Sequence, residues 1–365
     1  MVNAEILQAF LWHIGLYSHS LEDIDTEEVL ITQARYFIGI DLGLLREGIR
    51  FDDVLLLLLL DIERQTNKCD WSGAERNCQL FDRLAQNKKV PITLLFERWY
   101  HEAVVFRRLG LYDKALSCTY QAETFADNPL HKFRTLLLRG DIESANNNRY
   151  EFGINSLSLA LHEAEQLGQH YVAQVYNKMA HMCSMRYVGL GISFLRKAQV
   201  IGDKLGDAKL ILDNKFARAN LYIVLAMRYP NEEQLFLDEA KRVLNSIQYD
   251  KLPLPQNKIY YKEMWARVNH DVEPLKEAYT FYAKINALDD ICRICDAIIE
   301  IGINYHQPAQ ALPYIAIYRE ALIKRNRKDV QANLRHLQQT EEIINGILLR
   351  VCFPLIIKRA CSLPC

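Results

Sequence analysis

The chain has 365 residues, enough for roughly two or three average domains or for one long array of repeats. Lysine and arginine (44) balance aspartate and glutamate (45), so no global positive charge favours sequence-independent binding to nucleic acid. Glycine (15) and proline (10) are scarce and 50% of the residues are hydrophobic, which is typical of a packed, mostly helical protein.

The first 50 residues predict a small helical module. Residues 6–17 and 27–45 have the periodicity of two amphipathic helices, which would either cap the segment that follows or form a separate effector unit. The cations of this module are Arg35, Arg46 and Arg50, and eight acidic residues oppose them. Few phosphate contacts are therefore available, which disfavours a DNA-binding regulator.

A wholly apolar run, Val54 to Leu60, follows between Asp53 and Asp61. It is seven residues long, whereas a membrane-spanning helix needs about 20 apolar residues. The N-terminus also lacks the basic stretch of a secretory signal. We therefore expect a helix buried on most sides, and neither a membrane span nor export.

Large and small residues occur at fixed spacings in residues 99–122. The pattern is Trp99-x3-Ala103-x2-Phe106-x3-Gly110-x-Tyr112-x2-Ala115-x6-Ala122. It resembles a tetratricopeptide repeat, in which two helices pack through small residues and join at a tight turn. Trp99, Ala103 and Phe106 would share one face of the first helix, and Gly110 would allow the turn.

The same positions recur every 38 residues. The columns are Ala122, Ala160 and Ala198; Leu116, Ile154 and Ile192; Ala115, Gly153 and Gly191; Tyr112, Tyr150 and Val188; and Trp99, Leu137 and Val175. The usual tetratricopeptide period is about 34 residues, so each pair is longer by about one helical turn. We predict an all-α, right-handed superhelical solenoid, with an array of about six helix pairs over residues 51–325.

The pattern loosens towards the C-terminus but stays helical. Further pairs are predicted at 208–227 with 232–247, 256–269 with 273–286, and 289–304 with 308–324. Residues 326–365 are predicted to contain a terminal capping helix, over 328–350, and a tail.

The nine cysteines predict reduced thiols in the cytoplasm, because their number is odd and a chain of this size needs no disulfides. Cys292 and Cys295 have the spacing of a redox or zinc half-site, but they lie in a segment of helical periodicity without a second such pair. We expect no metal or other cofactor. A role for this pair of cysteines stays open.

The predicted superhelix has a concave groove, lined by the first helix of each pair, that can bind an extended peptide or a partner helix. Projecting the register of Trp99 onto each repeat gives these candidate binding residues: Arg107, Arg108, Asn146, Tyr176, Asn214, Arg218, Tyr222 and Tyr261. The most suggestive are Asn214, Arg218 and Tyr222, because an amide, a guanidinium and a phenol can bond a peptide unit, a carboxylate and an apolar side chain. The alternative is an ordinary solvated helix face, with Tyr222 half in the core.

The layout, together with motifs in residues 235–322, resembles the Rap and arbitrium-receptor group of bacterial cytosolic receptors for signalling peptides. The motifs are Lys241-x-x-Leu244-Asn245-Ser246-Ile247, Tyr260-Tyr261, Ala278-x-x-Phe281-Tyr282 and Gln310-Ala311-x6-Tyr318. The resemblance implies peptide-controlled binding to a response regulator or to DNA. No DNA-reading helix is recognisable in residues 1–50, which favours a protein partner.

No phosphate-binding glycine loop, GxSxG or HExxH motif is present in the sequence, so we expect a binding protein and not an enzyme. A peptide receptor that regulates a partner and a constitutive scaffold or adaptor for a multiprotein complex both remain open. The sequence also leaves open whether the chain forms a homodimer.

Overall fold

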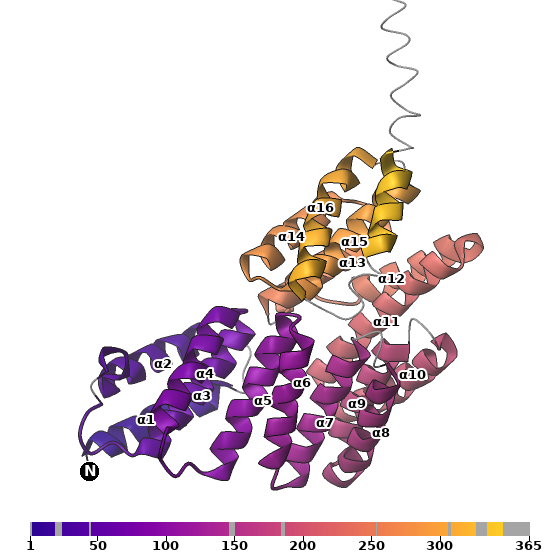
Figure 1. The fold of residues 1–365 in the computed structure, drawn as a ribbon. Helices are drawn as coiled ribbons and strands as arrows, with labels where there is room; N and C mark the ends of the chain where they lie inside the picture. Colours follow the sequence, from indigo (N-terminus) through magenta and orange to yellow (C-terminus); the bar gives the residue numbers. More distant parts are fainter. Residues whose placement is uncertain are drawn as a thin grey trace, which may run out of the picture.

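The computed structural model describes residues 2–18, 24–43, 45–145, 150–183, 187–252, 254–305, 308–325 and 334–345. Every regular element in these ranges is a helix, and successive helices pack against one another along the chain (Figure 1). The predicted all-α solenoid of tetratricopeptide-like helix pairs is confirmed.

Two helices, α1 (Val2–Ser18) and α2 (Ile24–Ile38), and a short 3-10 helix, η1 (Ile40–Leu42), precede the array. They pack near α3 (Phe51–Asn67), and their buried apolar side chains belong to one core with those of the first array helices. The apolar run of α3 is buried on most sides, as predicted, with only Leu56 exposed. Among the described helices, none has the length and apolarity needed to cross a bilayer.

The array alternates first and second helices. The pairs are α3 with α4 (Trp71–Ala85), α5 (Ile92–Arg108) with α6 (Tyr112–Thr124), α7 (Pro129–Ser144) with α8 (Tyr150–Leu167), α9 (Gln169–Cys183) with α10 (Val188–Leu205), α11 (Ala208–Arg228) with α12 (Glu233–Asn245), α13 (Pro255–Asn269) with α14 (Glu273–Lys284), and α15 (Leu288–Asn304) with α16 (Pro308–Arg325). Short 3-10 helices, η3 (Pro230–Glu232) and η4 (Tyr249–Lys251), precede α12 and α13. The described part of the array thus has seven pairs, one more than predicted.

The small residues of the predicted columns lie where helices approach closely. Ala115 and Ala160 are fully buried. Gly153 of α8 faces the backbone of α7, because a Cβ at this position would lie 2.9 Å from the Ser144 nitrogen and 3.2 Å from the Gly140 oxygen. The absence of a side chain at Gly153 therefore sets the separation of α7 and α8.

Replacing Gly153 with alanine is expected to lower the free energy of unfolding by about 1–2 kcal/mol, because the atoms that the methyl group meets are backbone atoms and cannot rotate away. Urea unfolding followed by circular dichroism measures the change. Gly189 of α10 is the matched control, since a Cβ there would have nothing within 4 Å. Gly189→Ala should be neutral or mildly stabilising, and an equal loss in both variants would contradict the packing argument.

The array curves so that its last helices return to its first ones. In Figure 1, α13–α16 lie above the ends of α5 and α6. Phe281 of α14 and Ile285 pack against the apolar core that extends from α1 to α7. Residues 334–345 form a further helix inside the predicted capping segment, and Leu337 and Ile344 are buried in the core built by α13–α16.

Candidate functional site

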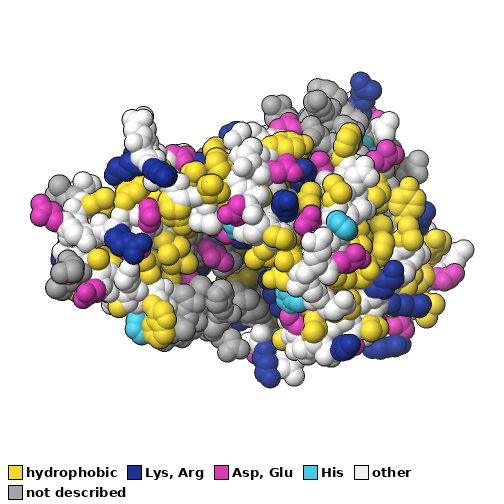
Figure 2. Space-filling view, turned by 90° about the horizontal axis from the view of Figure 1, so that it is seen from below, with side chains coloured by type: hydrophobic (Ala, Val, Ile, Leu, Met, Phe, Trp, Pro, Cys, Tyr) yellow, Lys and Arg dark blue, Asp and Glu magenta, His cyan; other side chains and the backbone are white. Residues whose placement is uncertain are grey.

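The first helices of the array carry titratable side chains that are exposed to solvent and yet desolvated by the surrounding protein. His181 of α9, Asp213 of α11 and Asp296 of α15 are exposed. Desolvation by the surrounding protein nevertheless lowers the pKa of His181 and raises the pKa of Asp213 and of Asp296. Side chains that reach solvent but are desolvated lie on a concave surface. Figure 2, viewed from the side opposite α13–α16, shows a hollow near the middle of the molecule.

Four side chains from four first helices form what we call the inner charge cluster: Arg107 of α5, Asp141 of α7, Lys178 of α9 and Asp289 of α15. Arg107 Nε donates to Asp141 Oδ2 at 3.0 Å, and Lys178 Nζ donates to Asp141 Oδ1 at 2.8 Å. Arg107 Nη1 donates to Asp289 Oδ2, also at 3.0 Å. The last bond joins residues 182 positions apart and links the start of the array to its end.

Two members of the inner charge cluster, Arg107 and Asp141, have pKa values shifted so that both stay ionised at neutral pH. Burial alone would raise the pKa of Asp141, but the charges of Lys178 and Arg107 outweigh it and hold that pKa far below its usual range. Burial likewise acts against the charge of Arg107, while Asp141 and Asp289 contribute to a net rise of its pKa. Burial lowers the pKa of His181, and the charge of Lys178 adds to this effect, so the imidazole is neutral at pH 7.

A second group of charged side chains lies on α13 and α15. Arg293 donates to Glu263, which is 1% exposed, and to Asp290 at 2.6 Å. The guanidinium lies 5.2 Å from the ring centroid of Tyr260 and 5.7 Å from that of Tyr282. Burial raises the pKa of Tyr260 to about 12, so the phenol stays neutral. Arg293 is thus held in place by carboxylates on one side and aromatic rings on the other.

The structure brings only some of the predicted site residues to this region. Arg107 belongs to the inner charge cluster, and Arg108 next to it is exposed. Asn146 lies outside the described residues. Tyr176 and Tyr261 pack within the array, Tyr176 stacking on Phe194 of its partner helix at 5.8 Å between ring centroids.

Of the predicted stripe on α11, Asn214 is buried, whereas Arg218 and Tyr222 are partly exposed. Asn214 is 3% exposed and its amide nitrogen donates to Asn177 Oδ1 at 3.0 Å and to the Leu195 carbonyl at 2.9 Å. Arg218 donates to Gln199 of α10 at 3.1 Å, and Tyr222 packs partly into the cores between α11 and its neighbours. Asn214 therefore faces packed helices, while Arg218 and Tyr222 contact neighbouring helices and stay partly exposed.

For Asn214 the error is one of register. Side chains that contact one another across neighbouring first helices are 34 residues apart between Arg107 and Asp141 and 37 apart between Asp141 and Lys178. The spacing between Asn177 and Asn214 is also 37. A projection by 38 residues exceeds the two 37-residue spacings by one residue and the 34-residue spacing by four, and one residue turns a helix by about 100°. The exposed residue of α11 at this level is accordingly Asp213.

Five residues of this region were not predicted from the sequence: Asp141, Lys178, His181, Asp289 and Arg293. The sequence did contain a signal for Asp141 and Lys178. They are an acid and a base 37 residues apart on consecutive first helices, and a repeat period of 37 residues would make them neighbours. No local pattern marks Asp289 or Arg293, since their contacts with the start of the array or with α13 depend on how the whole superhelix curves.

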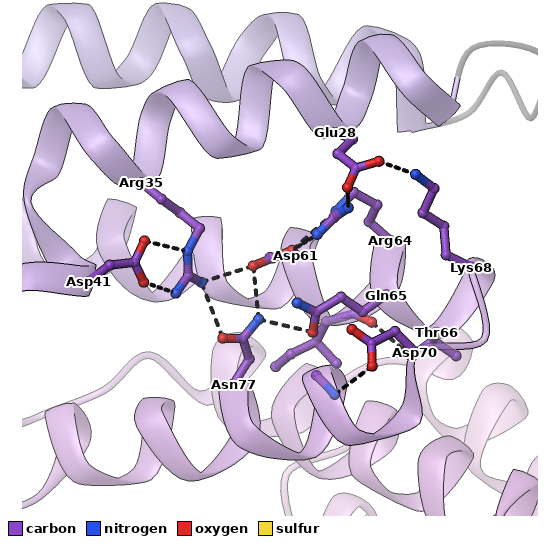
Figure 3. A network of polar contacts seen from close by, with 12 residues as sticks. Glu28, Arg35, Asp41, Asp61, Arg64, Gln65, Thr66, Lys68, Asp70 and Asn77 are labelled. Atoms are coloured by element: carbon purple, nitrogen blue, oxygen red, sulfur yellow. Dashed lines mark hydrogen bonds and ion pairs between the residues drawn. The ribbon is translucent and has the colours of Figure 1, made fainter. Parts of the chain in front are cut away.

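A separate buried polar network joins the N-terminal helices to the array (Figure 3). Asp61 of α3 is 1% exposed and accepts bonds from Arg35 of α2 at 2.8 Å, Arg64 of α3 at 2.7 Å and Asn77 of α4 at 2.8 Å. Arg35 is also paired with Asp41. Because the partners of Asp61 come from three helices, the network fixes α2 against α3 and α4.

Within the described ranges, no group of three or more His, Cys, Asp or Glu residues is arranged to hold a metal ion. Cys292 and Cys295 are both buried in α15. Burial raises the pKa of the Cys295 thiol, which disfavours the thiolate that metal binding and disulfide exchange require.

These features define the chain as an α-solenoid of tetratricopeptide-like helix pairs that closes around a charged hollow. Its fold is similar to that of a Rap protein complexed with competence and sporulation factor, at 13% identity and a TM-score of 0.52, over 94% of this chain and 99% of that one. It is also similar to the Rap conjugation gene regulator of the plasmid pLS20 in complex with the Phr* peptide, at 14% identity and a TM-score of 0.57, over 92% and 97%. No protein-family profile and no curated protein matches the sequence. The chain therefore has the Rap fold over nearly its whole length.

Proposed function

We propose that this protein is a peptide receptor, in which an extended peptide bound in the hollow controls the binding of a partner protein. The observation that carries the proposal is the convergence of ionised side chains on one concave surface. They come from helices as distant in sequence as α5 and α15, whose Arg107 and Asp289 are 182 residues apart. A surface built from so many repeats can hold an extended ligand along its length.

The chemistry of the hollow fits a peptide better than a purely apolar or purely anionic ligand. Lys178 offers ammonium donors, while Asp213 and Asp296 offer exposed carboxylates. A peptide carries an ammonium group, a carboxylate and backbone amides, so it can pair with both kinds of group. Support also comes from the two Rap structures, which contain a named factor or a peptide.

The finer points of the proposal follow from the resemblance to Rap receptors. The protein acts in the cytoplasm, binds its ligand without catalysis and regulates a protein partner such as a response regulator. Nucleic acid is disfavoured as the partner, since the whole chain has a net charge of −1.

The proposal is tested by purifying the tagged protein from the organism that encodes it and analysing the small molecules released on denaturation by mass spectrometry. We expect a short peptide. The synthetic peptide should raise the melting temperature of the purified protein, corresponding to about 2.7 kcal/mol at a concentration one hundred times Kd.

A matched pair of variants localises the binding. Asp213→Trp places a large side chain in the hollow, whereas Asp203→Trp places it on the exposed surface of α10, a second helix. Only the first variant should abolish the thermal shift. If no peptide is released, and a protein partner is retained equally by both variants, the receptor is rejected in favour of a constitutive scaffold.

A further inference from the structure

The inner charge cluster holds two cations side by side on the wall of the hollow. Arg107 and Lys178 come from different helices, α5 and α9, and both bond the carboxylate of Asp141 on α7 between them. Like charges repel, so this arrangement needs the shared carboxylate to keep the two cations close. The result is a pair of positive groups whose positions are fixed before any ligand binds.

Both cations retain hydrogen-bond donors for a further partner. A lysine ammonium has three donors and an arginine guanidinium has five, whereas the bonds described above use one donor of Lys178 and two of Arg107. The Lys178 side chain is 46% exposed. The unused ammonium donors are therefore open to the hollow.

Cations of both charged groups act on the same stretch of wall. His181 lies three residues after Lys178, on the same face of α9. The charges of Lys178, Arg107 and Arg293 lower the pKa of this exposed imidazole, and the charge of Asp141 raises it. Three cations therefore lie within electrostatic reach of His181, alongside the carboxylates of Asp141 and Asp289 that bond Arg107.

Asp289 shows which kind of anion this wall accepts. Its carboxylate comes from α15, distant in the sequence, and bonds the Arg107 guanidinium at 3.0 Å. Charge-assisted bonds between guanidinium or ammonium groups and carboxylates are among the stronger polar contacts in proteins.

We propose that Arg107 and Lys178 form a subsite for the free C-terminal carboxylate of the bound peptide. This inference rests on the proposed function and adds the chemical class and the orientation of the ligand, whose last residue would lie against α5 and α9. The carboxylate would accept from Lys178 Nζ and from the remaining guanidinium donors of Arg107, while Asp141 keeps both cations in place.

The test uses the full-length protein and two synthetic hexapeptide pools. The peptides contain no Asp or Glu, so the C-terminal group is the only carboxylate that they can carry. One pool ends in a carboxylate and the other in a carboxamide. Each is passed over immobilised protein and over a blank support, and retained peptides are measured by mass spectrometry. Peptides of the first pool should be retained at least about tenfold more than their amide counterparts.

Variants of the cations then locate the subsite. With the best retained peptide, Lys178→Gln and Arg107→Gln should each weaken binding of the acid form by about tenfold in titration calorimetry and leave the weak binding of the amide form almost unchanged. Lys204→Gln, an exposed lysine on α10, should change neither form. Lys178→Gln remains informative if Arg107→Gln fails to fold, because Lys178 is much less buried.

The outcomes separate the two proposals. Equal retention of the acid and amide pools, above the blank, would overturn the carboxylate subsite and leave the peptide receptor standing. Retention of neither pool above the blank would overturn both. An acid preference that persists in Lys178→Gln and Arg107→Gln would place the carboxylate elsewhere and so also overturn the subsite.

Discussion

Replacing Asp61 with alanine is expected to lower the free energy of unfolding by about 3–5 kcal/mol, because it leaves buried cations without their shared partner. The Asp61 carboxylate is 1% exposed and bonds Arg35, Arg64 and Asn77. Arg35 keeps Asp41, and Arg64 keeps Glu28 at 2.9 Å. These remaining pairs place the expected loss towards the lower end of the range.

The matched control is Asp41→Ala, which removes the other carboxylate of Arg35. The Asp41 side chain is 56% exposed, so water replaces it and the expected loss is below about 1 kcal/mol. Urea unfolding of both variants by circular dichroism gives the two values, provided the slope with denaturant is unchanged. Losses of similar size would mean that burial of Asp61 does not set the strength of the network.

The fold was predictable because the features that define it are local. Ala115, Gly153 and Ala160 are small because helices that approach closely leave no room for larger side chains, and this requirement recurs with every pair. The apolar run of α3 likewise follows from burial on most sides. Such constraints leave a periodic trace in the sequence that survives when neither a family profile nor a curated protein matches.

The site was less predictable because it depends on register and on closure. Extrapolating 38 residues at a time placed Asn214 in the groove, but successive first helices here contact one another at spacings of 34 and 37 residues. An error of one residue matters little when a helix boundary is predicted. The same error in a projected position moves the side chain to another face of the helix, because one residue turns a helix by about 100°. The closure of the superhelix is harder still to predict from sequence. The Arg107–Asp289 contact forms only because small rotations between all the intervening pairs add up to bring α15 back to α5.

Asp61 shows a third kind of limit. In the sequence it marks the end of an apolar run, which is where a solvated charge is usually found. In the structure the same aspartate is buried, and its partners Arg35 and Asn77 lie 26 and 16 residues away on other helices. Only the tertiary packing of α2 and α4 on α3 makes its burial favourable.

Replacing Glu27 with glutamine is expected to stabilise the protein at about pH 8 by up to about 3 kcal/mol. Glu27 of α2 is 5% exposed. Burial is the main cause that raises its pKa from 4.5 to about 7; the nearby charges of Glu63 and Asp61 add to the rise, and Arg64 opposes it. The ionised carboxylate is therefore the unfavourable form in the folded protein, and a neutral amide of the same shape removes that cost.

The sign of the pH dependence follows from the same shift. Between about pH 4.5 and pH 7 the unfolded chain has released the Glu27 proton while the folded protein still holds it, so this group makes the free energy of unfolding fall as pH rises through that window. Glu27→Gln should remove this fall and have little effect at about pH 4.5. Urea unfolding of both proteins across the window measures the difference.

The adjacent residue provides a control of opposite sign. The bond from Lys68 is the main cause that lowers the pKa of Glu28, so Glu28 stabilises the folded state above its unfolded pKa and this contribution is lost as pH falls. Its side chain is 42% exposed, which limits the expected loss in Glu28→Gln at about pH 8 to below about 1 kcal/mol. If Glu27→Gln were instead destabilising at that pH, the Glu27 carboxylate would have to be ionised and well solvated or paired, contrary to its burial beside Glu63 and Asp61.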